Sequence, residues 1–413
     1  MLIGSTSPNP HRWPKALRHD GRDFLTTAQV ARVLGVKTQS VYAYVSRGQL
    51  DSVRIAGVRG SLFAVGEVEA FRARTARRPP AGIVERIQTE ITLIENDRLY
   101  YRGRDATELA WNSDFIDVVE MLWGTTAGTD HRGSMRGVLP PLPPIAGRRV
   151  DAIRVMIDLL GAADTHRGDV ASDAVAEKAM CVIDAIVEAL PVIGHPPRGH
   201  DLADRLWSRL SPMAPTPQRV RLLNAALVLL ADHDLAAGTI AARVAASARG
   251  SVYAVISAGL GAFDGPLHGG ATTVAQEFLT AVLADPEGPD HAVAAHLLDE
   301  QRLPGCGHVI YRHRDPRAEA LIDGLIADGG RRGILTALDA ARAGVNGLDR
   351  GFVNSDLALA AFALRYRMVD DAAETIFAVA RIAGWVAHAI EEYREPRLRF
   401  RPEGVYTGIR PAG

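Results

Sequence analysis

Cysteine is scarce in this chain, with only Cys181 and Cys306 among 413 residues. Nothing in their number or spacing suggests a disulfide framework, so the sequence predicts a reducing compartment, which we expect to be the cytoplasm. Cys181 lies in an apolar helical stretch and is expected in the core. Neither an HExxH pattern nor a CxxC pair occurs, and the sequence therefore predicts no metal site.

Long apolar segments are also missing. The longest apolar run covers residues 222–231, is interrupted by Asn224 and is too short to cross a bilayer. The sequence near Met1 has no apolar stretch of the signal-peptide kind. Aromatic residues make up only 6% of the chain, whereas hydrophobic residues reach 47% and alanine is abundant. This composition predicts no membrane partner and favours closely packed helices around a buried core.

A large net charge is absent as well, because the formal value is −1, but the charge is unevenly distributed. Residues 1–80 hold 13 Lys and Arg against 5 Asp and Glu, a net +8, which leaves −9 for the rest. The length of 413 residues predicts two or three domains. We therefore expect the basic part to be a separate module with an anionic partner, and a merely soluble basic tail is the alternative.

Residues 24–75, within the basic part, have the pattern of a small folded module. The pattern predicts a helix that begins at the capping residue Thr26 and is broken at Gly35. A second helix and the two sides of a small β-wing follow, at residues 37–45, 53–55 and 62–65. This arrangement resembles the winged helix-turn-helix of the MerR and excisionase type.

The second helix of this module carries the groups expected to bind DNA. Lys37, Gln39 and Ser40 open the helix and are able to reach base edges and phosphates, and Arg47 adds a cation near its end. The module therefore predicts a DNA partner. The alternative is a helical hairpin that docks a protein partner or supports dimerisation.

The remainder of the chain has mainly helical periodicity. Residues 72–80 are charged and end in proline, which predicts a linker between a module at 1–78 and a body at 79–413. Strands are predicted at 91–95 and 98–103, around an Asn96-Asp97 turn. Loops are predicted at 130–147 and 196–199, and helices at 150–160, 220–231, 236–258 and 372–393, the last amphipathic.

Two histidines lie beside glycines in turn-like segments of the body. His268 lies in Gly265-Pro266-Leu267-His268-Gly269-Gly270-Ala271, and His308 follows Gly305-Cys306-Gly307. An imidazole between glycines is more often presented to a cleft than packed in a core. Arginines follow His308, and an arginine fork binds carboxylates while histidine exchanges protons near neutral pH. The pattern indicates an enzyme that performs proton chemistry on a small anion.

The order of these segments resembles the citrate synthase family from about Gly82 to Gly408, and the Gly265–Ala271 segment is the most specific part. The other matching segments are Tyr101-Arg102-Gly103-Arg104-Asp105 with Glu108-Leu109-Ala110, Ala231-Asp232-His233-Asp234-Leu235, Gly305-Cys306-Gly307-His308 with Asp315-Pro316-Arg317, Asn354-Ser355-Asp356, Gly384-Trp385-Val386-Ala387-His388, and Arg401-Pro402 with Tyr406-Thr407-Gly408. The resemblance implies a mainly α-helical citrate synthase fold behind the small winged helix-turn-helix module. It also implies a large domain at 79–269 and 368–413 with a small domain, 270–367, inserted into it.

The same resemblance implies condensation of acetyl-CoA with oxaloacetate, followed by hydrolysis of the thioester, with no cofactor beyond these substrates. Asp356 would be the base, His268 would donate a hydrogen bond to the thioester oxygen, and His308 would polarise and protonate the ketone. Four residues would hold the oxaloacetate carboxylates, namely His233, Arg317, Arg381 and Arg401. Arg312 would contact the CoA phosphate. In the family the arginine at the position of Arg401 comes from the partner subunit, which implies a homodimer.

Two other functions fit the sequence. A 2-methylcitrate synthase would use propionyl-CoA in the same site, and one methylene separates the two substrates by only about 1–3 kcal/mol. A transcription regulator would use the body only to sense a ligand. The presence of His268, His308 and Asp356 together with the arginines favours an active enzyme over this regulator.

Overall fold

The computed structural model describes residues 16–19, 22–34, 36–55, 58, 60–68, 71, 87–125, 145, 147–300, 302–329 and 332–400. The chain divides into two compact units, residues 1–86 and 87–413. The predicted linker at 72–80 lies outside the described residues, as do residues 130–144 of the predicted loop.

The N-terminal unit combines two helices with a small antiparallel sheet. Its strands β1 (Leu17–His19), β2 (Arg22–Thr26) and β3 (Leu62–Ala64) are ordered β1-β2-β3. Helices α1 (Thr27–Leu34) and α2 (Thr38–Ser46) pack on each other. Thr26 starts α1 as predicted, because its hydroxyl accepts the Gln29 N–H at 3.4 Å while the Gln29 side chain accepts the Thr26 N–H at 2.8 Å. A separate small core supports this unit, formed by Leu25, Val30, Ala31, Val41, Leu50, Phe63, Val68 and Phe71.

The predicted wing differs from the observed sheet. Val53 makes only an isolated bridge with Leu62, whereas β3 pairs along its length with β2. The N-terminal strands β1 and β2 were not predicted, because they are short and their polar and apolar residues do not alternate. Gly57, which lies between the two predicted sides of the wing, is outside the described residues.

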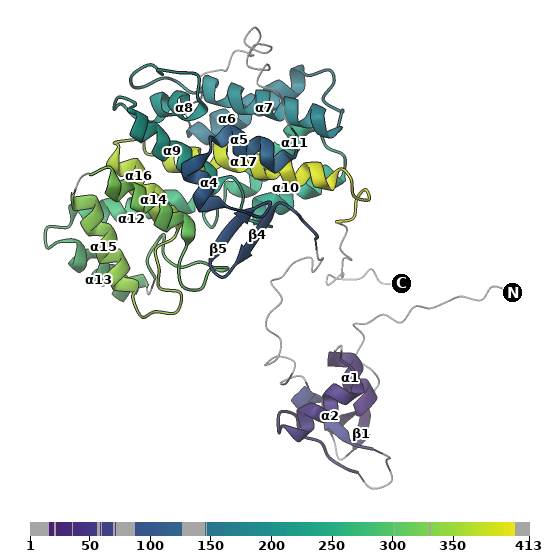
Figure 1. The fold of residues 1–413 in the computed structure, drawn as a ribbon. Helices are drawn as coiled ribbons and strands as arrows, with labels where there is room; N and C mark the ends of the chain where they lie inside the picture. Colours follow the sequence, from purple (N-terminus) through teal and green to yellow (C-terminus); the bar gives the residue numbers. More distant parts are fainter. Residues whose placement is uncertain are drawn as a thin grey trace, which may run out of the picture. The chain divides into compact units, whose positions relative to one another are not determined.

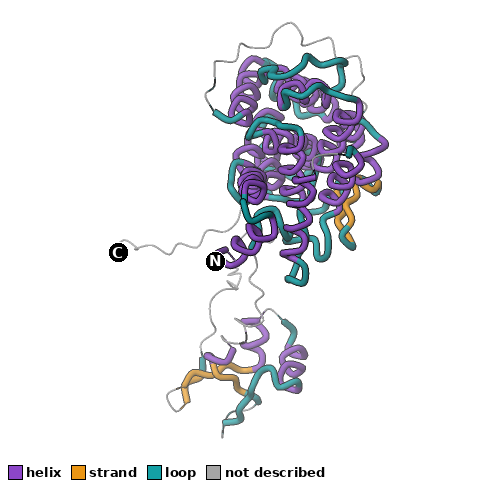
Figure 2. The backbone as a smooth tube through the Cα atoms, turned by 90° about the vertical axis from the view of Figure 1, so that its left-hand side faces the viewer, coloured by secondary structure: helices purple, strands orange, loops and turns teal. Residues whose placement is uncertain are grey.

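The larger unit is mainly helical, in agreement with the predicted fold class. One small sheet contains β4 (Thr92–Glu95), β5 (Arg98–Tyr101) and β6 (Arg104–Asp105), and Figure 2 shows these strands at one edge of the body. The described helices are α4 (Ala106–Asn112), α5 (Phe115–Trp123), α6 (Arg149–Ala163), α7 (Ser172–Ala189), α8 (Leu202–Leu210), α9 (Pro217–Leu230), α10 (Ala237–Ser247), α11 (Val252–Phe263), α12 (Ala271–Ala284), α13 (Pro289–Glu300), α14 (Pro316–Ala327), α15 (Arg332–Val345), α16 (Ser355–Arg365) and α17 (Ala372–Glu392).

Most of the predicted elements lie where the sequence placed them. β4 and β5 occupy the predicted strand positions, and Asn96 and Asp97 turn between them with φ of 52° and 55°. Residues 196–199 belong to no helix or strand, as predicted. The prediction of one helix over 236–258 is wrong, because α10 and α11 are separate. Arg249 takes a left-handed φ of 60°, and the Ser251 hydroxyl caps the start of α11 by accepting the Ala254 N–H.

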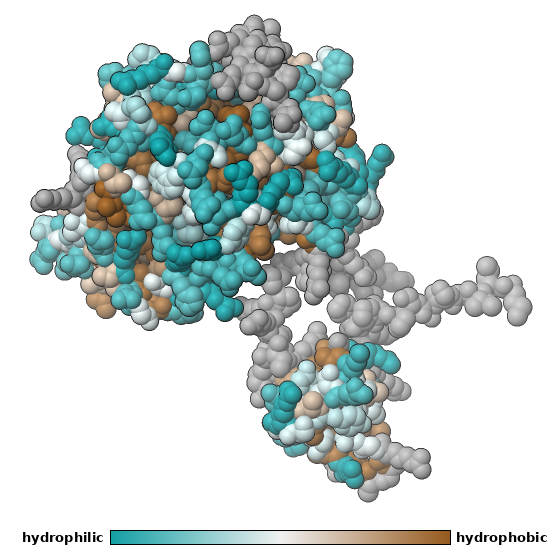
Figure 3. Space-filling model, in the orientation of Figure 1, coloured by the Kyte–Doolittle hydropathy of each residue, from teal (hydrophilic) through white to brown (hydrophobic). Residues whose placement is uncertain are grey.

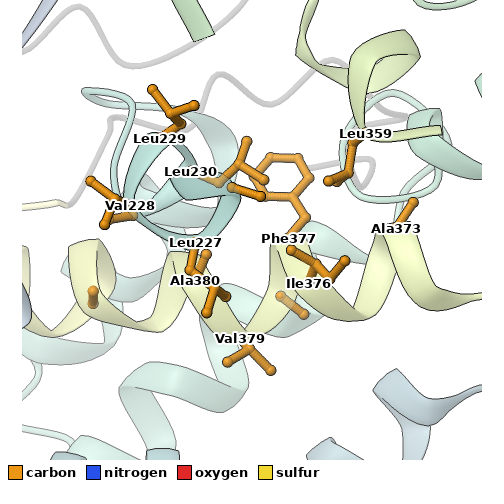
Figure 4. Packing of buried hydrophobic residues seen from close by; sticks show 14 of the residues in the cluster. Leu227, Val228, Leu229, Leu230, Leu359, Ala373, Ile376, Phe377, Val379 and Ala380 are labelled. Carbon is orange, nitrogen blue, oxygen red and sulfur yellow. The ribbon is translucent and has the colours of Figure 1, made fainter. Parts of the chain in front are cut away.

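The helix predicted at 372–393 is present as α17, but the prediction that it is amphipathic is wrong. Nearly every side chain of α17 is buried, including the charged Glu374, Arg381 and Glu392. The helix runs through the body and packs against α5, α6, α7, α9, α10, α11, α12 and α16 (Figure 1). Figure 4 shows its apolar side chains meeting those of α9 and Leu359 of α16. Its length and composition would suit a membrane span, but its most apolar stretch is entirely buried, as in a core helix.

Helices α12 to α16 form a group of their own beside α17. α12 packs on α16 and α15, α13 on α15, and α14 on α16. The group meets the other helices through contacts of α14 with α9 and of α12 and α16 with α17. The face of the body visible in Figure 3 is mainly hydrophilic with apolar patches between, which agrees with a core that holds most of the apolar side chains. The histidines of interest lie in three loops: His233 between α9 and α10, His268 between α11 and α12, and His308 between α13 and α14.

Candidate active site

The predicted site residues come from five separate segments of the body. His233 lies three residues after α9, and His268 lies in the turn between α11 and α12. His308 lies in the loop that leads to α14, and Asp356 begins α16. Arg317 in the first turn of α14 and Arg381 in the middle of α17 complete the set. All six are close enough to interact electrostatically with at least one other member, so the structure brings them together.

His233 and His308 lie side by side around a buried tyrosine. Their ring centroids are 5.0 Å apart, and Tyr311 lies 5.4 Å and 5.1 Å from them. The His233 Nε2 is 3.0 Å from the Tyr311 hydroxyl. Burial, with the nearby charge of Arg317, lowers the pKa of His233 well below its usual range and the pKa of His308 to about 4. Both rings are therefore neutral near pH 7.

The proton of the neutral His308 ring can be assigned. The backbone N–H of Ile310 donates to His308 Nδ1 at 3.1 Å, so Nδ1 is an acceptor and carries no hydrogen. Nε2 must then be the protonated nitrogen. This tautomer gives the ring one hydrogen-bond donor for a ligand, and the short bond within its own loop fixes the orientation of the ring.

The loop around His308 is held by its glycines and by the start of α16. Gly305 has a φ of +70°, and a Cβ there would lie 2.5 Å from Leu357 Cβ. Gly307 donates its N–H to the Phe352 carbonyl at 2.7 Å, and its own carbonyl accepts from the Asn354 side chain at 2.9 Å. The loop that supplies His308 is therefore tied directly to the segment that supplies Asp356.

Two buried arginines give the site its positive charge. Arg317 donates from Nε and Nη2 to both oxygens of Asp315, at 3.0 Å and 2.8 Å, and its side chain is only 4% exposed. Arg381 donates from Nε to the Leu230 carbonyl at 2.9 Å and stacks over the Phe377 ring at 4.7 Å. Burial lowers the pKa of Arg381 to about 10, so it remains charged at neutral pH. Its Nη2 is buried and has no hydrogen-bond partner among the described residues.

His268 lies in a tight turn against aromatic rings. The backbone N–H of His268 donates to the Gly265 carbonyl at 2.9 Å. The backbone N–H of Gly269 donates to the Phe263 carbonyl at 2.8 Å. Rings of Phe263 and Phe377 lie 5.2 Å and 5.8 Å away. Burial, with the charge of Arg381, lowers the pKa of His268 to about 4. Its Nε2 is buried and, within the described part of the chain, makes no hydrogen bond.

Asp356 is the acidic group of the cluster. The Asn354 side chain caps α16 by accepting the Asp356 N–H at 2.9 Å, which fixes the first turn of the helix. Burial raises the pKa of Asp356 to about 6, although the charges of Arg317 and Arg381 oppose this shift. A carboxyl with a pKa near 6 is a stronger base than an ordinary aspartate and is still mostly ionised at pH 7.

The other predicted site residues are not among these six. Arg312 is exposed, and its backbone N–H donates to Asp97 Oδ1 at 2.7 Å. Arg401 lies outside the described residues. In the N-terminal unit Lys37, Gln39 and Arg47 are exposed, and Ser40 is half-buried. No group of three or more His, Cys, Asp or Glu side chains suited to a metal ion occurs among the residues described.

Sequence reasoning missed two groups at the centre of the site. Tyr311 is completely buried between His233 and His308 and lies 5.5 Å below the Arg317 guanidinium. Asp315 fixes Arg317 and also accepts the Ser355 N–H at 3.0 Å, which links α14 to α16. Their place in the same loop as His308 and Arg317 was the available signal. The arrangement as a whole brings neutral imidazoles, a buried carboxyl and fixed cations together.

Comparison with known proteins decides the family. The family described as Citrate synthase, C-terminal domain, matches residues 82–403. The chain belongs to the citrate synthase family. It is therefore an enzyme of an acyltransferase family, and the family match spans every described site residue of the body.

Relatives and solved structures agree with this family. Citrate synthase 2 of Bacillus subtilis is 28% identical over 364 residues, covering 81% of this chain and 96% of the relative. 2-Methylcitrate synthase of Mycobacterium tuberculosis is 29% identical over 390 residues, covering 84% of this chain and 97% of the relative. The citrate synthase structure from Thermotoga maritima matches with a TM-score of 0.66 and 23% identity, over 80% of this chain and 95% of that one. The structure of the Thermoplasma acidophilum citrate synthase, a ternary complex with carboxymethyl coenzyme A and oxaloacetate, matches with a TM-score of 0.64 and 22% identity, over 80% and 96%. At these identities the two structures establish the fold.

Proposed function

We propose that this enzyme condenses acetyl-CoA with oxaloacetate to give citrate and free CoA. The observation that carries the proposal is the pair of buried arginines, Arg317 and Arg381, beside neutral histidines and a basic aspartate. The Nη2 of Arg381 is a buried charged donor that lacks an acceptor among the described residues, and a carboxylate would supply one. Oxaloacetate is a dicarboxylate with a ketone between its carboxyl groups. If the arginines bind its carboxylates, we expect its ketone to lie next to His308.

The proposed reaction begins with removal of a proton from the acyl methyl group. Asp356 accepts this proton, and the bond electrons move towards the thioester oxygen as an enol forms. His268 donates a hydrogen bond to that oxygen, which lowers the energy of the developing charge in a buried site. A neutral imidazole suits this role because its acid form has a pKa of about 4, so the ring stays uncharged at neutral pH.

The enol carbon then attacks the ketone carbon of oxaloacetate. His308 Nε2–H donates its proton to the ketone oxygen as the new carbon–carbon bond forms. Water subsequently hydrolyses the thioester, which releases the CoA thiol and the new carboxylate. His233, Arg317, Arg381 and Arg401 are proposed to hold the oxaloacetate carboxylates, and Arg312 to contact the CoA phosphate. No cofactor is required: the proton that Asp356 takes from the methyl group is returned through solvent to His308, which has given its own to the ketone oxygen, and the hydrolysis releases one proton to solvent.

The second candidate is condensation of propionyl-CoA to 2-methylcitrate. The 29% identity to 2-methylcitrate synthase is as high as the identity to the citrate synthase relative, which favours testing both. Steady-state assays with oxaloacetate and either acyl-CoA, following free CoA and identifying the product by mass spectrometry, separate them. Release of CoA that does not depend on oxaloacetate contradicts both reactions. Binding of oxaloacetate with no turnover would favour the ligand-sensing regulator.

The arginine site has its own test. Arg381→Lys keeps the positive charge and loses the planar fork, so affinity for oxaloacetate should fall by about tenfold or more. Isothermal titration calorimetry measures this directly. Arg342→Lys, at a partly exposed position on α15, is a matched control and should bind oxaloacetate as the wild type does. Unchanged affinity of the Arg381 variant would mean that this arginine is structural.

We also propose the larger organisation implied by the family. Residues 270–367 would form the small domain, and its closure on the large domain (79–269 and 368–413) would exclude water during condensation. The enzyme would be a cytoplasmic homodimer in which Arg401 of the partner subunit completes each site. The N-terminal module, residues 1–78, would bind DNA through Lys37, Gln39, Ser40 and Arg47. The +8 charge of residues 1–80 supports a partner that is an anionic polymer.

A further inference from the structure

His233 occupies the middle of a tight turn whose neighbours fix its backbone. The carboxylate of Asp232 accepts the N–H of Asp234 at 3.1 Å, and Asp234 takes a left-handed φ of 53°. The Tyr101 hydroxyl lies 3.0 Å from the Asp232 carbonyl. The position of the His233 ring therefore depends on how firmly the Asp232 carboxylate is held.

Two side chains from distant segments hold that carboxylate. Thr92 donates its hydroxyl to Asp232 Oδ2 at 2.6 Å, and His388 Nε2 lies 3.3 Å from the same oxygen. Asp232 and His388 are completely buried. From the other side, a Cβ on Gly384 would come within 2.2 Å of Asp232 Oδ1. The Asp232 carboxylate is therefore enclosed between residues of β4 and α17.

His388 is itself oriented by a buried arginine. Arg243 in α10 places Nε and Nη2 at 3.0 Å and 2.8 Å from His388 Nδ1. A guanidinium only donates, so Nδ1 accepts, and the ring proton of His388 lies on Nε2, facing Asp232. Arg243 also contacts Glu391 and donates to Glu392 at 2.9 Å, and Arg399 donates to Glu392 with two bonds of 2.6 Å. A continuous chain of charged and polar groups therefore runs from Arg399 to the turn that carries His233.

We propose that His388, oriented by Arg243, is a positioning residue that fixes the Asp232 carboxylate and thereby holds the His233 ring in place for the carboxylate of oxaloacetate. This inference rests on the proposed function for the identity of the ligand. Packing alone does not call for such a chain, because replacement of buried ion pairs by apolar side chains is often neutral or stabilising. The Asp232 carboxylate is next in sequence to His233 and also interacts electrostatically with Arg381, so the chain acts on the site through these two residues.

The test compares two replacements of the same histidine. His388→Leu removes both ring nitrogens, whereas His388→Gln keeps an N–H at the position that faces Asp232. The Leu variant should raise the KM for oxaloacetate about ten- to hundredfold, the range expected for loss of a hydrogen bond to a charged group, and leave the KM for acyl-CoA little changed. The Gln variant should recover most of the affinity. Arg209→Met is the control, because Arg209 of α8 is also a buried arginine, and it is bonded to Glu188 of α7. It should lower the thermal stability without changing either KM.

Each result has a defined meaning. A folded His388→Leu enzyme with an unchanged oxaloacetate KM overturns the proposal, as does an equal loss in the Leu and Gln variants. If the Leu variant does not fold, Thr92→Val removes the shorter bond to the same oxygen and should raise the same KM. If the wild type fails to condense oxaloacetate, the proposed function fails, and crystal structures of the variants then decide the inference. The His233 Nε2 to Tyr311 hydroxyl contact of 3.0 Å should be lost in His388→Leu and retained in His388→Gln.

Discussion

Asp356 is held in the site by the start of α16 and carries the chemistry proposed for the first step. Replacement by alanine removes the base and leaves Arg317 and Arg381 in place. We therefore expect Asp356→Ala to lower kcat by roughly 10²–10⁴-fold while oxaloacetate still binds. Steady-state kinetics and calorimetry measure the two quantities separately. In the wild type, kcat should fall as the pH drops through about 6, because protonation of Asp356 removes the base. Near-normal turnover of the variant would exclude this residue as the base.

The same residue should weaken the fold at neutral pH. Burial raises the pKa of Asp356 from 3.8 to about 6, so the folded state favours the protonated carboxyl. The stability that the protonated Asp356 carboxyl allows is fully present below about pH 4. It is lost as the pH rises through 6 and the buried carboxyl ionises. Asp356→Asn, which cannot ionise, should therefore have a larger free energy of unfolding than the wild type at pH 8, and the difference should shrink towards pH 4. Denaturant unfolding at both pH values measures it, with the exposed Asp349→Asn as control. A variant that is less stable at pH 8 would contradict the shift.

At the scale of elements, the loop before α14 depends on glycine at position 305. Alanine at a positive φ costs about 1–2 kcal/mol, and at Gly305 the added Cβ would also meet Leu357 Cβ at 2.5 Å. The loop must shift, and His308 shifts with it. Gly305→Ala should lower kcat/KM by as much as about 100-fold. Gly329→Ala is the matched control, since it has a φ of +62° with no atom within 4 Å of the new Cβ. It should lose stability and keep its activity, and equal activities of the two variants would contradict the steric argument.

The elements also show which features a sequence can predict. Short strands around Asn96-Asp97 and the glycine-flanked histidines carry local signals, and both lie where the sequence placed them. The break between α10 and α11 was missed because alanine-rich periodicity continues across it. The burial of α17 on all sides could not be predicted, because buried charges on this helix have partners far away in the chain. Glu374, for example, is bonded to Arg148, and Glu392 is bonded to Arg243. The role of Tyr311 likewise depends on two loops that meet only in the folded body.

For the whole molecule, the proposed dimer makes a quantitative prediction. Arg317→Ala and Arg401→Ala should each inactivate the enzyme, because each removes a cation from the proposed carboxylate site. If Arg401 comes from the partner subunit, a mixed dimer contains one site with both changes and one intact site. Random mixing should then restore about one quarter of the wild-type activity, since half of the dimers are mixed and half of their sites are intact. Native mass spectrometry confirms that mixed dimers have formed. Their inactivity would contradict a site shared between subunits.

The N-terminal module is expected to be separable from catalysis. Every described residue of the candidate active site lies in the unit that starts at Ile87, so deletion of residues 1–78 should leave kcat and both KM values close to those of the full chain. Steady-state assays of both forms measure this. A large loss of activity in a folded, dimeric truncated enzyme would mean that the module takes part in assembly of the active site.

DNA binding by this module makes the last prediction. Lys37, Gln39 and Arg47 are exposed on and beside α2, and residues 1–80 carry a net +8. If these groups neutralise phosphates, binding releases counterions, and the logarithm of the affinity falls by about 0.9 per phosphate for each tenfold rise in salt. Lys37→Ala and Arg47→Ala should each weaken binding and reduce this slope by about 1, as fluorescence anisotropy with a DNA duplex would measure. Arg342→Ala in the body is the control. If the full chain shows no salt-dependent binding at low ionic strength, the module does not bind duplex DNA, and docking of a protein partner becomes the explanation for its charge.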